Sequence, residues 1–149
     1  MYKLDTLDEQ LIRLLEKDAR QNSEDLAKQL NVSAATIRRR LKKLTKSEVV
    51  RITASVNPDR FGLPVIAVIA LDVVPEKVQE IAQKLVEYTE VRWVSTTTGQ
   101  FDIIIIVAFR STHDLSEFTY SVVTGLEGLR RTETFICLDI KKSRFVEKS

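Results

Sequence analysis

The chain has 149 residues, of which 44% are hydrophobic, which suits one domain or two small domains with a real core. Its formal net charge is only +2, and its single cysteine, Cys137, excludes an intramolecular disulfide. No apolar run approaches the roughly 18 residues that span a bilayer, and the first residues carry no apolar signal core, so we expect a cytoplasmic protein without a membrane partner.

The charge is distributed unevenly along the chain. Residues 1–60 hold 13 Lys/Arg and 9 Asp/Glu, whereas residues 61–149 hold 10 and 12. Positive charge is densest between Arg38 and Lys46. Because a basic patch acts locally, the small total charge is compatible with binding to nucleic acid.

The first part of the chain is predicted to form three short helices. Apolar residues at helical spacing place them at about residues 7–18, 24–30 and 34–46. The second and third helices meet at Asn31 and Val32, and Ser23 and Ser33 are each placed to cap one of them. Residues 49–56 predict a short strand or hairpin that would form a wing. Residues 57–62 form a connector marked by Pro and Gly.

The second part of the chain changes character. Residues 65–74, 91–98, 102–109 and 130–141 predict strands, and residues 76–88 and 111–126 predict helices. Gly99 and Gln100 fit a tight hairpin turn. The resulting βαββαβ order is the split-βαβ, ferredoxin-like arrangement. The expected fold class is therefore α+β, with a helical domain over residues 1–60 and a ferredoxin-like domain over residues 61–149.

Two strands of this predicted sheet lack the alternation of apolar and polar residues. Residues 65–71 and 103–109 are apolar at almost every position, although helices in such a sheet cover only one face. Both faces must therefore be shielded from water. We infer that a second copy of the sheet covers the other face in a homodimer. The alternative is that the chain's own amino-terminal domain covers it.

The third helix carries a candidate DNA-contacting surface. With Ile37 at the centre of its core face, Ala35, Arg39, Lys42 and Lys46 lie on the opposite side. Arg39 is long enough to reach guanine, and the lysines suit phosphates. The predicted DNA-binding residues are Ser33, Ala35, Thr36, Arg38, Arg39, Lys42, Lys43 and Lys46.

Two alternatives remain at this helix. Arg40 lies nearer the core side, where it either braces the fold or reaches a phosphate. The second alternative is that the basic helix does not bind DNA and is an exposed surface whose charge keeps the protein soluble. The helix–tight turn–helix spacing that leads into it and the wing-like segment that follows it favour DNA. Two such helices in a dimer would enter successive major grooves of double-stranded DNA, which predicts a pseudo-palindromic site.

Short matches along nearly the whole chain carry a family resemblance. In order, they are Asp8, Asp18-Ala-Arg20, Leu26-Ala27, Ser33-Ala-Ala-Thr-Ile-Arg-Arg-Arg40-Leu-Lys-Lys-Leu44, Asn57-Pro58 with Phe61-Gly62, Val91-Arg-Trp-Val94, Thr98-Gly-Gln-Phe-Asp102 and Gly128-Leu-Arg-Arg-Thr-Glu-Thr134. Each match is weak alone, but their order is specific. The chain resembles the Lrp/AsnC (feast/famine) family of transcriptional regulators.

The resemblance implies a winged helix-turn-helix followed by a ligand-sensing ferredoxin-like (RAM) domain. It implies dimers through the second domain, often assembled into tetramers of dimers, and an amino acid or related small metabolite as effector. The sequence departs from the family pattern at Glu48, where the family usually has Gly before the wing.

The resemblance also places a candidate effector site. Thr97, Thr98, Gly99, Phe101 and Asp102 match the family's Thr-Gly-x-Tyr-Asp loop, with Phe in place of Tyr. Asp102 is a candidate acceptor for an amino acid's ammonium, and the Gly99 amide and the threonine hydroxyls are candidate donors to its carboxylate. Thr134, with Glu133, is expected nearby on the last strand. The alternative is an ordinary tight turn, which favours Gly and Asp for conformational reasons.

Enzymatic sites find little support in the sequence. His113 is the only histidine, so no pair of histidines is available for a metal or a proton relay, and no Gly-rich phosphate loop occurs. No metal or cofactor is expected. Two alternatives share the architecture, namely a sirohaem decarboxylase-like enzyme and a DNA-architectural protein that senses no ligand.

Overall fold

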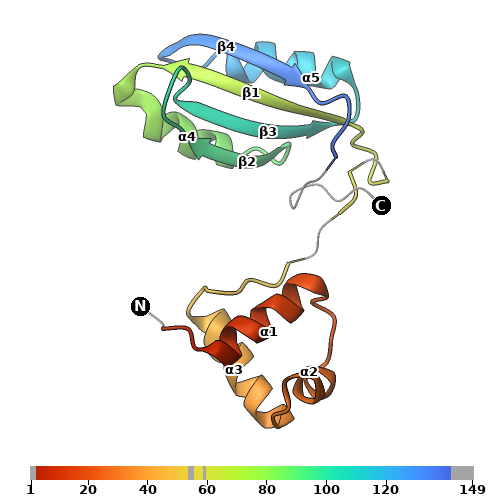
Figure 1. Ribbon diagram of the computed structural model, residues 1–149. Helices are drawn as coiled ribbons and strands as arrows, with labels where there is room; N and C mark the ends of the chain where they lie inside the picture. Colours follow the sequence, from red (N-terminus) through yellow and green to blue (C-terminus); the bar gives the residue numbers. More distant parts are fainter. Residues whose placement is uncertain (1–2, 54–55, 59, 142–149) are drawn as a thin grey trace. The chain divides into compact units, whose positions relative to one another are not determined.

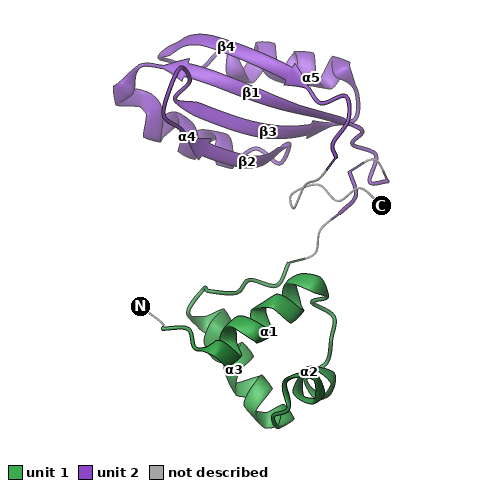
Figure 2. Ribbon diagram, in the orientation of Figure 1, with its two compact units in different colours: residues 1–54 green, residues 55–149 purple. Residues whose placement is uncertain are grey.

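The computed structural model describes residues 3–53, 56–58 and 60–141 (Figure 1). The chain divides into two compact units, residues 1–54 and 55–149 (Figure 2). The described part of the first unit is helical, and that of the second is a four-stranded sheet with helices. The predicted order of a helical domain followed by a ferredoxin-like domain is confirmed.

The first unit packs its helices around a small apolar core. The helices are α1 (Thr6–Lys17), α2 (Ser23–Leu30) and α3 (Ala34–Lys46). The buried residues of this core are Leu11, Leu15, Leu26, Ala27, Ile37 and Leu44. The predicted tight turn lies between α2 and α3, where Asn31 adopts a left-handed φ of 52° and the Val32 N–H donates to the Ala27 carbonyl at 3.0 Å.

The N-terminal cap of α3 is the residue that the sequence predicted, whereas the N-terminal cap of α2 is not. Ser33 caps α3 as expected, because its Oγ accepts the Thr36 N–H at 3.1 Å. The prediction for Ser23 is wrong. Asn22 is the N-cap of α2, with its side chain accepting the Asp25 N–H at 2.8 Å, and Ser23 is the first residue of the helix.

The carboxyl end of α3 is closed by a Schellman motif. Glu48 has φ 57°, the Glu48 N–H donates to the Thr45 carbonyl at 3.2 Å, and the Val49 N–H donates to the Leu44 carbonyl at 3.1 Å. A left-handed φ explains why Gly suits this position, where this chain carries a glutamate.

The predicted wing strand is not present in residues 49–53 or at Val56, and residues 54 and 55 lie outside the described residues. The Val49 and Val50 N–H groups both donate to the Leu44 carbonyl, which ties the start of this segment to α3. A strand also needs a neighbour to pair with, and within the described residues this segment pairs with no other strand.

The second unit is an antiparallel sheet of order β2-β3-β1-β4. Its strands are β1 (Val65–Val73), β2 (Val91–Thr96), β3 (Ile103–Phe109) and β4 (Leu129–Ile136). After β1 come a short 3-10 turn, η1 (Pro75–Lys77), and α4 (Val78–Val86), and after β3 come α5 (Thr112–Phe118) and a π-helical turn, η2 (Thr119–Val123). The βαββαβ order is confirmed.

Helices α4 and α5 lie on the same side of the sheet (Figure 1). Odd-numbered positions of β1 and β3, such as Ile69 and Ile105, share one buried cluster with Leu85 of α4 and Leu115 of α5. Even-numbered positions point to the other face. We call this the open face, and its residues in the two central strands are Ile66, Val68, Ala70, Ile104, Ile106 and Ala108.

The last strand and the last helix are shorter than predicted. Strand β4 ends at Ile136, and the Cys137 N–H donates to the Ile66 carbonyl at 2.8 Å, near the start of β1, so there is little further partner strand to extend β4 toward residue 141. Helix α5 changes to η2 after Phe118, and the helical run ends at Val123 rather than at residue 126.

Candidate nucleic-acid interface and effector loop

Helix α3 presents cations on one side and apolar residues on the other. Ile37 and Leu44 are fully buried. The side opposite to them, which we call the basic face, consists of Ala35, Arg38, Arg39, Lys42, Lys43 and Lys46, all exposed. No acidic residue occurs in the helix. The predicted exposure is therefore confirmed, whereas contact with DNA stays a prediction.

The start of α3 is polar and compact. The Ser33 and Thr36 hydroxyl oxygens lie 2.9 Å apart, so the two side chains also bond to each other. Ser33 is exposed and Thr36 is half-buried. Beside them, Ala35 contributes only a methyl group, which leaves the backbone of the first turn open to close approach.

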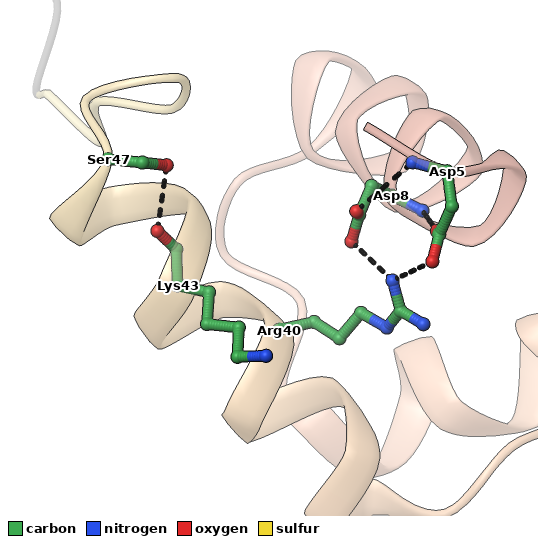
Figure 3. A network of polar contacts seen from close by, with 5 residues as sticks. All are labelled: Asp5, Asp8, Arg40, Lys43 and Ser47. Carbon is green, nitrogen blue, oxygen red and sulfur yellow. Dashed lines mark hydrogen bonds and ion pairs between the residues drawn. The ribbon is translucent and has the colours of Figure 1, made fainter. Parts of the chain in front are cut away.

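Arg40 is the one arginine of α3 that turns toward the protein (Figure 3). Its guanidinium donates to Asp5 Oδ2 at 2.5 Å and to Asp8 Oδ1 at 2.9 Å. Asp8 is 1% exposed, and the two aspartates form a capping box at the start of α1. Of the two roles left open for Arg40, the structure therefore supports bracing of the fold.

Electrostatics in this cluster follow from its geometry. The hydrogen bond from Arg40 is the main cause that lowers the pKa of Asp5, with a further contribution from the Asp8 backbone N–H. The same bonds, first to Asp5 and then to Asp8, raise the pKa of Arg40. Asp5 and Arg40 are therefore both charged near neutral pH, and α1 and α3 are joined by opposite charges.

Arg38 of the basic face already has a partner. Its Nη1 donates to Glu24 Oε1 of α2 at 2.8 Å, and both side chains are 59% exposed. The Glu24 backbone N–H and this bond together lower the pKa of Glu24. A phosphate that approaches Arg38 must therefore compete with a carboxylate.

The candidate effector loop, residues 97–102, joins β2 to β3. The Thr97 N–H donates to the Asp102 carbonyl at 2.8 Å, and Thr97 Oγ1 donates to the Phe101 carbonyl at 2.6 Å. These bonds close a loop longer than the predicted two-residue turn. Thr98 and Gly99 lie exposed at its tip, and Gly99 has φ 111°.

Asp102 is tied to the neighbouring strand. Its N–H donates to the Leu71 carbonyl at 2.9 Å, and its Oδ2 accepts the Val73 N–H at 2.9 Å. The pairing of β1 with β3 ends at Leu71 and Ile103, so the Val73 N–H has no β3 carbonyl opposite it and is bonded by the Asp102 side chain instead. Arg130 Nη2 lies 3.8 Å from the same carboxylate oxygen.

The start of β4 contributes two arginines that the sequence analysis did not single out for this site. Arg130 donates to Asp72 Oδ1 through Nε at 2.8 Å and to the Val73 carbonyl through Nη2 at 2.7 Å. Arg131 lies over the Phe101 ring, 5.5 Å from its centroid, and pairs with Glu133. Thr134 lies opposite Ile69, further along β4 from the loop than Arg131.

Comparisons with known proteins match both units. A family model for the AsnC-type helix-turn-helix domain matches residues 4–45, and a family model for the Lrp/AsnC ligand binding domain matches residues 66–146. An uncharacterised HTH-type transcriptional regulator of Pyrococcus furiosus is 39% identical over 140 residues, which are 93% of this chain and 95% of that protein. The chain belongs to the Lrp/AsnC family of transcriptional regulators.

Other members of the family agree with this assignment. The HTH-type transcriptional regulator FL11 of Pyrococcus furiosus is 34% identical, with 93% of this chain and 92% of that protein covered. The solved structure of E. coli AsnC is 28% identical and superposes with a TM-score of 0.87 over 96% of this chain and 97% of that chain.

A regulator from Neisseria meningitidis, solved as a complex with L-methionine, shares the fold. It is 22% identical, with a TM-score of 0.86 over 95% of this chain and 94% of that chain.

Membership in the Lrp/AsnC family identifies the general function of the chain. The chain is a transcriptional regulator with a helix-turn-helix DNA-binding domain and a ligand-binding domain. The comparisons give no support to a sirohaem decarboxylase or to an architectural protein that senses no ligand. No helix in the described ranges is long and apolar enough to cross a membrane. Within the same ranges, no three His, Cys, Asp or Glu side chains are grouped to hold a metal ion.

Proposed function

We propose that this regulator docks the basic face of α3 in the major groove of double-stranded DNA. The observation that carries the proposal is the segregation of charge on α3, where exposed cations occupy one side and no acidic residue interrupts them. Arg39 is the base-reading residue of this proposal. Lys42, Lys43 and Lys46 bind phosphates, and Ser33, Ala35 and Thr36 form the closely approaching first turn.

A homodimer supplies the second recognition helix. On the open face, Val68, Ile104 and Ile106 are only half-buried in the single chain, and the described helices lie on the other face of the sheet. A second copy of the sheet is an apolar surface that would cover them. Dimers that assemble further, into a tetramer of dimers, would bend DNA and multiply contacts. The site read by one dimer is then a pseudo-palindrome. Regulation of this kind takes place in the cytoplasm and involves no catalysis.

The effector of this proposal is an amino acid that binds at the loop of residues 97–102. The L-methionine complex of the Neisseria regulator, which has the same fold, supports this ligand class. Thr98 and Gly99 at the loop tip are accessible donors, and Phe101 lies beneath a guanidinium. The effector changes DNA affinity by binding one assembly state better than another.

DNA docking is tested with two substitutions on the basic face. Duplexes enriched from a random pool are titrated by fluorescence anisotropy over a series of salt concentrations. We expect Arg39→Ala to weaken the binding free energy for the preferred sequence by about 1–3 kcal/mol. The difference in affinity between the preferred sequence and random DNA should become smaller. We expect Lys42→Ala to weaken all sequences alike and to reduce the salt slope by about 1.

The control for this experiment is Lys84→Ala, which removes an exposed lysine of α4 on the other unit. It should leave both the affinity and the salt slope at the values of the unmodified chain. Equal affinities and slopes for Arg39→Ala, Lys42→Ala and the control would refute docking through α3.

The effector loop is tested with Asp102→Asn. The asparagine oxygen still accepts the Val73 N–H, so the fold is kept, while the negative charge that would pair with an ammonium is removed. In a thermal-shift screen against the twenty amino acids, we expect the stabilisation by the active ligand to be lost. DNA affinity without ligand should stay the same. A ligand titration identical to that of the unmodified chain would remove Asp102 from the site.

A further inference from the structure

The second unit contains a cavity of about 500 Å³ that the effector loop does not border. Its lining includes Phe109 and Arg110, at and beyond the end of β3, whereas the loop of residues 97–102 precedes the start of β3. The cavity and the loop are therefore at opposite ends of this strand. A volume of this size is sufficient for a small metabolite.

Aromatic and aliphatic side chains form the buried side of this cavity. Phe109 and Phe118 are 5% and 7% exposed, and their ring centroids lie 5.3 Å apart. Tyr88 meets Phe118 edge to face at 5.5 Å, and Val122 completes this side. Such a surface suits an apolar body of a ligand and offers no charge to it.

Charged side chains form the accessible side. Glu90, Asp114 and Glu117 contribute three carboxylates, and Arg110 contributes one guanidinium. Glu117 faces His113 at 3.8 Å, and Glu90 accepts from Thr89 at 3.3 Å. Within the described part of the chain, Arg110 and the Asp114 carboxylate have no hydrogen bond or ion pair to satisfy them.

We propose that this cavity is a second small-molecule site, which takes an α-amino acid with an apolar side chain. The ligand's side chain lies against Phe109, Phe118 and Tyr88. Its carboxylate pairs with Arg110, and its ammonium faces the carboxylates of α5, Asp114 and Glu117. Groups of both signs above an apolar surface match the three parts of such a ligand, and neither a plain amine nor a plain carboxylic acid satisfies them all.

The test follows methyl resonances of the full-length chain during titration with L-leucine and with L-phenylalanine. The Leu63 and Val122 methyls report on the cavity, and the Thr97 and Thr98 methyls report on the effector loop. We expect shifts at Leu63 and Val122. Phenethylamine and 3-phenylpropionate, which lack the carboxylate and the ammonium of phenylalanine, should bind the cavity about tenfold more weakly.

Variants distinguish the charged groups. Arg110→Gln and Glu117→Gln change exposed side chains, so the fold is kept. Each substitution should weaken binding of the amino acid in the cavity about tenfold. The matched control, Arg92→Gln, replaces an exposed arginine of β2 outside the cavity and should change nothing.

Three results would overturn the proposal. These are an Arg110→Gln titration identical to the control, phenethylamine binding as tightly as phenylalanine, and cavity resonances that do not move. Shifts confined to Thr97 and Thr98 would overturn the cavity site while leaving the effector loop of the proposed function intact. DNA binding is measured separately through Arg39 and Lys42, and none of these outcomes changes its interpretation.

Discussion

At the scale of single residues, the cations of α3 are divided among three uses. Arg40 is held by Asp5 and Asp8, Arg38 is held by Glu24, and Arg39 stands on the basic face with the lysines. Six cations close together in the sequence therefore do not give six contacts to DNA. The carboxylate of Glu24 lies beside the basic face, where it opposes the approach of phosphate.

We therefore expect Glu24→Gln to strengthen DNA binding a few-fold. The substitution frees Arg38 from an exposed, solvent-screened ion pair and removes a negative charge near the phosphates. The salt slope should become steeper by up to about 0.9, since one more cation then meets DNA. Anisotropy titrations measure both quantities, with Glu9→Gln on α1 as the control. Weaker binding, or a slope equal to that of the control, would show that the Glu24–Arg38 pair is kept in the complex.

At the scale of helices, the cluster of Arg40, Asp5 and Asp8 sets how α1 and α3 meet. The capping box closes the first turn of α1, and the guanidinium joins that turn to the middle of α3 (Figure 3). Because Asp8 is buried, removal of Arg40 would leave a buried carboxylate without its guanidinium. The basic face is thus oriented by residues that do not touch DNA.

This cluster predicts a loss of stability in acid. The pKa of Asp5 is lower in the folded chain than in the unfolded chain, so its contribution is present above its ordinary pKa. That contribution is lost as the pH falls below roughly 4 and through the folded pKa. Asp5→Asn keeps a good helix cap but loses the charge, so it should lower the urea midpoint at pH 7. At about pH 2 the two midpoints should converge.

Urea denaturation followed by circular dichroism at both pH values gives this comparison. Asp114→Asn in α5 is the control for a general effect of removing a carboxylate. A midpoint difference between Asp5→Asn and the unmodified chain that stays constant from pH 7 to the acid limit would contradict a stabilising role for the ionised Asp5.

The helices and their order follow from local sequence, whereas these polar contacts do not. Spacing of residues such as Ile37 and Leu44 predicts α3 because both lie on one face of a helix. Arg40 meets Asp5 across 35 positions, and Asp102 meets the Val73 N–H just beyond the point where the pairing of β1 with β3 ends. No periodic pattern in the sequence predicts either contact.

The ends of elements also depend on distant partners. Strand β4 stops near the start of β1, and Asn22 replaces Ser23 as the cap because the helix begins one residue earlier than its apolar pattern indicates. At the effector loop, the sequence pattern placed Thr97 and Asp102 at the ends of strands, whereas both lie on the longer connection between β2 and β3. Arg130 and Arg131 come close to it only through the pairing of β4 with β1.

At the scale of the whole molecule, a basic helix and an apolar sheet face belong to one chain. The open face contains Ile106, which is half-buried in the isolated chain and central to the proposed dimer. Ile106→Asp should give a folded monomer, because an aspartate in the dimer interface would be buried without a partner. Sedimentation measures the oligomeric state, and Val86→Asp, at an exposed apolar position of α4, is the control that should stay dimeric.

Hydroxyl-radical footprinting on the selected duplex measures whether a dimer docks two α3 helices in DNA. We expect two protected half-sites about one helical turn apart for the unmodified chain and for Val86→Asp. We expect Ile106→Asp to lose the paired pattern and Arg39→Ala to lose protection at low concentration. A single uninterrupted or sequence-independent footprint that is identical for all four proteins would contradict docking of a dimer through α3.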